Sequence, residues 1–132
     1  MKLFKQFNIT VILITIGIQL SFAKPPKGFE KIDQKIIIST MEAQMKYDVK
    51  SFSVKPNAKV QMVFKNPDSL PHNLIICTPG KKKGGDKGQE VIDAVLKLGD
   101  KGVKMNWEPK GHTRILASSG MVQPGKEITF YF

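Results

Sequence analysis

The sequence predicts an all-β protein, a Greek-key β-sandwich with one short helical insertion. Short apolar or alternating runs recur with turn signals between them, roughly every ten residues, which is typical of sandwiches. Hydrophobic residues make up 41% of the chain and charged residues 24%, an ordinary balance for a globular domain. A length of 132 residues corresponds to about one domain. We therefore expect all of these runs to belong to one sandwich.

Residues 1–23 have the features of a secretory signal peptide. Lys2 and Lys5 give a positive start, an apolar stretch follows from Ile9 to Leu20, and Ser21-Phe22-Ala23 is a small-x-small cleavage site. The apolar stretch is short for a membrane helix, which needs about 20 apolar residues, so an uncleaved anchor is the alternative. We expect export to the periplasm or the cell exterior. The formal net charge of +10 becomes +8 once Lys2 and Lys5 are removed.

The mature chain divides into a leader at 24–35, which is polar and contains prolines, and a domain at 36–132. The β-branched run Ile36–Thr40 predicts the first strand. Alternation over Met45–Val49 predicts a second strand, and the apolar positions then shift by one residue. A one-residue shift turns the inward face outward, so we expect a bulge near Lys50-Ser51, with the strand continuing to Val54.

The rest of the domain contains four further strands and the helix. Val60–Phe64 alternates, Leu74–Cys77 is a short apolar run, and Thr113–Ala117 and Glu127–Phe132 are further strand candidates. A helical insertion at about 88–98 is predicted from apolar residues at helical spacing. These residues are Val91, Ile92, Val95 and Leu96.

Few residues could carry metal chemistry. The single cysteine, Cys77, excludes an internal disulfide framework and a four-cysteine zinc site. His72 stands between Pro71 and Asn73, directly before an apolar strand. A histidine in a loop is most often a solvated surface residue, but a rigid loop with one imidazole is also what a metal ligand or a proton relay needs. From the pattern alone both interpretations stand.

The remaining candidates have simpler interpretations. Cys77 follows His72 by five residues, and odd separations in a strand place side chains on opposite faces, so we expect Cys77 to be structural rather than a shared ligand. His112 is expected at the surface. The Lys81-Lys82-Lys83 run is a solvated loop or a docking patch for an acidic partner. No aromatic residues interleave with it, so nucleic-acid binding is not expected.

The order of these motifs resembles a known family, the small blue copper proteins of the plastocyanin/azurin type (cupredoxins). The resemblance covers about 36–132, and the helical insertion is more similar to the azurin side of the family. The segments that carry the resemblance are Met45-Lys46-Tyr47, Phe52–Pro56, Val60–Asn66, Leu70-Pro71-His72-Asn73, His112–Ala117 and Pro124–Phe130.

The resemblance implies that His72 is the first copper ligand and that Asn73 supports the site by tying two loops together. It also implies that the other ligands, a Cys, a His and a Met, come from a loop near the C-terminus of such proteins. No such loop follows the strand Glu127–Phe132 in this sequence. We therefore expect the chain to be truncated, with the last strand and the remaining copper ligands beyond Phe132.

These observations lead to two hypotheses for function. The first is a single-electron carrier of the blue copper type, binding one copper ion outside the cytoplasm, with only the first ligand in this chain and an acidic redox partner protein. The alternative is a copper-free exported sandwich that binds a partner through its basic face. No nucleophile–base pair is apparent, so an enzyme is not expected. No membrane span is expected after signal cleavage.

Overall fold

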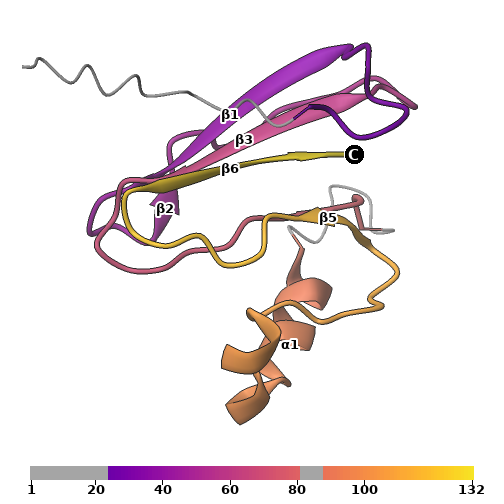
Figure 1. The fold of residues 1–132 in the computed structure, drawn as a ribbon. Coiled ribbons are helices and arrows are strands. Elements are labelled where there is room, and N and C mark those ends of the chain that lie inside the picture. The colour runs from indigo at the N-terminus through magenta and orange to yellow at the C-terminus, as the bar shows by residue number, and fades with distance from the viewer. Residues whose placement is uncertain (1–23, 81–87) are drawn as a thin grey trace, which may run out of the picture.

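The computed structural model describes residues 24–80 and 88–132 (Figure 1). The predicted signal peptide at 1–23 and the basic run Lys81-Lys82-Lys83 lie outside the described residues. Within the described ranges, no helix has the length and apolar character needed to cross a membrane.

Four strands form the larger sheet, in the order β2-β1-β3-β6. β1 (Gln34–Met41) and β3 (Val60–Asn66) pair in parallel, whereas β2 (Lys46–Tyr47) pairs antiparallel with β1 and β6 (Lys126–Tyr131) antiparallel with β3. The predicted strands at 36–40, 60–64 and 127–132 are thereby confirmed. β3 lies in the centre of the sheet, which explains why Val63, on its outer face, is buried as well as its inward residues.

The smaller sheet consists of β4 (Ile75–Cys77) and β5 (Ile115–Ser118), which pair antiparallel. Between these two strands the chain forms α1 (Gln89–Leu96), as the helical spacing predicts, and then two 3-10 turns, η1 (Gly99–Lys101) and η2 (Val103–Met105). In Figure 1 the smaller sheet lies between the four-stranded sheet and α1. The result is an all-β sandwich with one helical insertion.

The core lies between the two sheets. Val60, Met62 and Phe64 of β3 are fully buried, and Ile76 of β4 meets them from the smaller sheet. Complete burial of side chains of this size contributes about 2 kcal/mol each to folding. The alternating pattern of β3 therefore predicts correctly which face of the large sheet is inside.

The second strand is much shorter than its alternation predicts. β2 has two residues, and Met45 takes a left-handed backbone conformation with its side chain 78% exposed. The backbone N–H of Ser39 in β1 donates to the Asp48 carboxylate at 2.8 Å, so this side chain takes the place of a backbone partner and the ladder stops there. Phe52 and Val54 lie outside any strand and are partly exposed. The predicted bulge and continuing strand are wrong.

The leader contacts the domain. The ring of Phe29 packs against Tyr131 of β6, with ring centroids 5.4 Å apart. The backbone N–H of Lys59 donates to the Asp33 carboxylate at 2.8 Å, just before β3 begins. The regular structure begins at Gln34, two residues earlier than the predicted domain boundary.

Asn66, the last residue of β3, is the centre of a buried polar network. Its side chain is 1% exposed and makes four hydrogen bonds. The amide group donates to the carbonyls of Leu70 (2.8 Å) and Val122 (2.9 Å). The amide oxygen accepts from the Thr40 hydroxyl (3.0 Å) and the Asp68 backbone N–H (3.2 Å). One side chain thus joins the ends of β1 and β3, the loop after β3 and the segment before β6.

Replacing Asn66 with Ala should destabilise the fold by about 3 kcal/mol, because it leaves several buried donors and acceptors without partners. Urea unfolding of the two proteins measures this difference. Gln44→Ala, which removes an exposed amide, is the matched control and should change stability by less than about 0.5 kcal/mol. A loss below about 1 kcal/mol in Asn66→Ala would show that the network is not a major source of stability.

Candidate functional site

The backbone of His72 is fixed between two segments that are distant in the sequence. His72 forms an isolated antiparallel bridge with Val122, in which its N–H donates to the Val122 carbonyl at 3.0 Å and its carbonyl accepts from the Val122 N–H at 2.7 Å. Pro71, which directly precedes His72, has a fixed φ angle and also restricts the backbone of Leu70. The imidazole is therefore attached to a rigid point of the sandwich, although the residue lies in a loop.

The ring of His72 is fixed by a carboxylate. Nε2 lies 2.9 Å from Oδ2 of Asp68, and the two side chains are only 11% and 5% exposed. The other carboxylate oxygen accepts from the backbone N–H of Ser69 at 2.7 Å and of Ala43 at 3.4 Å. The hydrogen bond from His72 is the main cause that lowers the pKa of Asp68, and the Ser69 N–H is the next. Asp68 is therefore an ionised carboxylate facing the imidazole at neutral pH.

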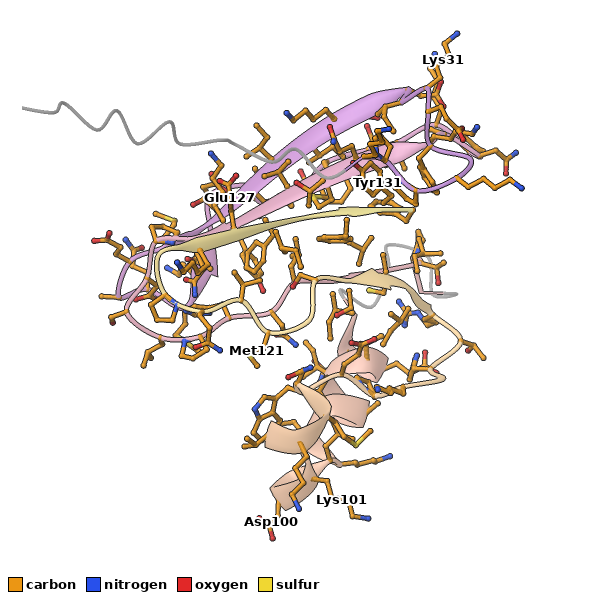
Figure 2. The ribbon with its side chains drawn as sticks, viewed as in Figure 1. Lys31, Asp100, Lys101, Met121, Glu127 and Tyr131 are labelled. Carbon is orange, nitrogen blue, oxygen red and sulfur yellow. The ribbon has the colours of Figure 1, made fainter. Side chains whose placement is uncertain are left out.

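His72 lines a surface pocket of about 680 Å³. Tyr47 of β2, Trp107 after η2 and Met121 before β6 form other parts of its wall. Figure 2 shows Met121 on the loop that leads to β6, on the side of α1. Gly102 is required for this wall, because a Cβ there would lie 2.3 Å from the Trp107 ring. His72 thus borders a pocket with mostly apolar walls.

Asn73 joins the two sides of this pocket. Its side-chain amide donates to the Asn106 carbonyl at 2.8 Å, and its backbone carbonyl accepts from the Tyr47 hydroxyl at 2.8 Å. Burial raises the pKa of Tyr47, so this hydroxyl keeps its proton and remains a donor well above neutral pH. The residue next to His72 therefore connects β2 with the turn after the helical insertion.

The other sequence candidates lie elsewhere. Cys77, a free and partly buried cysteine at the end of β4, lines a different hollow from His72. His112 is half-buried rather than fully at the surface, and its Nδ1 accepts from the Arg114 N–H at 3.3 Å. Within residues 24–80 and 88–132, no three His, Cys, Asp or Glu side chains are grouped so that they could hold a metal ion. Of the two histidines, only His72 lines the pocket described above.

Asp68 is not among the candidate residues named from the sequence above. Its signal was available, because an aspartate in the Asn66–Ser69 turn stands four residues before the histidine. Trp107 and Met121 were also missed, since their segments meet His72 only after folding.

The lowered pKa of Asp68 makes stability depend on pH. The carboxyl is stabilised in its charged form by the fold, so its contribution is complete above the ordinary value of 3.8 and is lost as pH falls through the lowered folded value. The difference in unfolding free energy between the protein and Asp68→Asn should therefore shrink below pH 3.8. Urea unfolding across this pH range measures it. A difference that grows on acidification would contradict the hydrogen-bonded, ionised carboxylate.

No protein-family model matches the sequence, and a search of curated proteins finds no match. Solved structures do match. Reduced auracyanin from Roseiflexus castenholzii is 24% identical, with a TM-score of 0.56 over 77% of this chain and 76% of that chain. Auracyanin A, a "blue" copper protein from Chloroflexus aurantiacus, is 21% identical, with a TM-score of 0.60 over 74% and 75%.

An azurin from Methylomonas sp. strain J is 16% identical, with a TM-score of 0.59 over 76% of this chain and 74% of that chain. At these identities the likeness is one of fold. The chain has the fold of the blue copper cupredoxins, an all-β sandwich with a helical insertion, as the resemblance in its sequence implies.

Proposed function

We propose that this protein is a single-electron carrier of the blue copper type, which acts outside the cytoplasm with His72 as one copper ligand. The observation that supports this most is the environment of His72. A buried carboxylate lies 2.9 Å from one ring nitrogen, and the residue lines a pocket with mostly apolar walls. Metal-bound histidines in proteins usually have such a partner behind the ring. The cupredoxin fold provides the second line of support.

Each part of the pocket has a role in this proposal. A bound copper ion would supply the redox change, alternating between two oxidation states. The chain itself fixes the position of one imidazole through the Val122 bridge and Asp68, and Trp107 and Met121 supply apolar parts of the pocket wall. Asn73 holds the two sides of the pocket together. A rigid, shielded environment favours electron transfer because little has to move when the charge changes.

The proposal needs ligands that the described residues do not supply. A blue copper site takes two histidines, one cysteine thiolate and a weak axial group such as methionine. Cys77 lines another hollow, and no group of three donors is present in the described ranges. Within those ranges, the proposal assigns only His72 as a copper ligand.

The location and the partner are also part of the proposal. The signal-peptide features of residues 1–23 support a periplasmic or secreted protein. The net charge of +8 after cleavage, ten less Lys2 and Lys5, favours an acidic redox partner. Lys81, Lys82 and Lys83 are the proposed docking residues.

A second candidate function is a copper-free sandwich that binds a partner through its basic face. The absence of a three-donor metal group in the described part of the chain favours it. The two candidates differ in what copper does to the full-length product.

Copper titration of the full-length product separates the candidates. Adding Cu(II) to the full-length product should produce an intense visible thiolate–copper absorption. His72→Ala should lose this band, because one strong ligand is gone. His112→Ala, which removes the other histidine, should keep it. The 132-residue chain alone should show no such band.

Two results would contradict the electron-carrier proposal. One is a complete protein that gives no thiolate–copper band, which would support the copper-free candidate. The other is a band that survives unchanged in His72→Ala. A band in the 132-residue chain would contradict the assignment of His72 as the single copper ligand among the described residues.

A further inference from the structure

The carboxylate of Asp68 is held so that one particular oxygen faces His72. Its Oδ1 accepts from the backbone N–H groups of Ser69 (2.7 Å) and Ala43 (3.4 Å), and the Ser69 hydroxyl lies 3.4 Å away. Its Oδ2 lies 2.9 Å from Nε2 of His72. Asp68 is 4% exposed, so water has little access to compete for either oxygen. The two oxygens therefore have separate and fixed partners.

This arrangement determines where the imidazole carries its proton. An ionised carboxylate has only acceptors, so Nε2 must donate. A neutral imidazole has one N–H, which leaves the lone pair on Nδ1. Among the described residues, no hydrogen bond involves Nδ1 of His72. We propose that Asp68 is a positioning residue that holds His72 in the tautomer with the proton on Nε2, with Nδ1 free to bind a metal.

Further hydrogen bonds hold the main chain of His72 and the loop of Asp68 in this arrangement. The two hydrogen bonds to Val122 fix the main chain of His72, and Asn66 fixes the loop that carries Asp68 by accepting from its N–H and donating to Leu70. Ring position and tautomer are thus both set before any metal binds. The consequence for copper rests on the electron-carrier function proposed above, whereas the tautomer itself does not.

Asp68→Asn gives a sharp test, because the fold determines which way the new amide faces. The N–H groups of Ser69 and Ala43 need an acceptor, so the single amide oxygen should take the place of Oδ1. The NH₂ group then faces Nε2 of His72, which must become the acceptor. The variant should therefore invert the tautomer and place the proton on Nδ1.

Long-range ¹H–¹⁵N correlation spectra of the metal-free protein, at a pH where the imidazole is neutral, distinguish the tautomers. His112→Gln removes the only other histidine, so every remaining ring signal belongs to His72. In this background we expect Nε2 to be protonated and Nδ1 to be the acceptor. Asp68→Asn should exchange the two patterns. Asp100→Asn, an exposed aspartate at the far end of the helical segment (Figure 2), should leave them unchanged.

A tautomer that is unchanged in folded Asp68→Asn would overturn the inference, as would a proton on Nδ1 when Asp68 is present. If Asp68→Asn does not fold, the protein with Asp68 still provides a test. A ring N–H that is buried and bonded to a carboxylate should exchange slowly with solvent and be visible as a separate proton signal on Nε2. Its absence would also overturn the inference.

A copper measurement separates this inference from the proposed function. In the full-length product, Asp68→Asn should weaken copper binding about 10- to 100-fold, the usual effect of losing the partner behind a metal-bound histidine. An inverted tautomer with unchanged copper affinity would overturn the ligand role of His72 and leave the positioning role of Asp68 intact. An unchanged tautomer would overturn the positioning role, whatever copper does.

Discussion

The four hydrogen bonds of the buried Asn66 side chain are the interaction on which the rest of this structure depends. They hold together the end of β1, the end of β3, the loop that carries Asp68 and the segment that contains Val122. Two of these pieces position His72 directly: the Val122 segment through the backbone bridge, and the loop with Asp68 through its carboxylate. A polar group at this depth is costly unless all its partners are present, so the network favours one arrangement of the loop over all others.

Most of the fold was predictable from the sequence because its strands bury one face. Alternation in Val60–Phe64 identifies β3 and its inward residues, and the apolar run Leu74–Cys77 identifies the position of β4. The same reasoning was wrong after Met45, where the Asp48 side chain replaces a backbone partner of β1 and the strand ends. Alternation reports which residues could face a core. It carries no information about a side chain that ends a ladder.

The site was predictable in part. Local sequence predicts that His72 lies in a restrained loop, and the resemblance to blue copper proteins gives it a role. The residues that contact His72 could not be predicted in the same way. Asp68 is local but needs the turn geometry to bring it 2.9 Å from Nε2, and Val122 and Trp107 reach the site only through the three-dimensional fold. Contacts between residues far apart in sequence leave no periodic signal, so no local pattern could have identified them.

The central claim is that this fold prepares His72 for metal binding before the metal arrives. The most direct measurement compares crystal structures of the full-length product without copper and with copper. We expect the imidazole to move by less than about 0.5 Å, with the contact between Nε2 and Asp68 intact and the metal on Nδ1. A ring that rotates away from Asp68 when copper binds, or copper bound elsewhere, would contradict the claim.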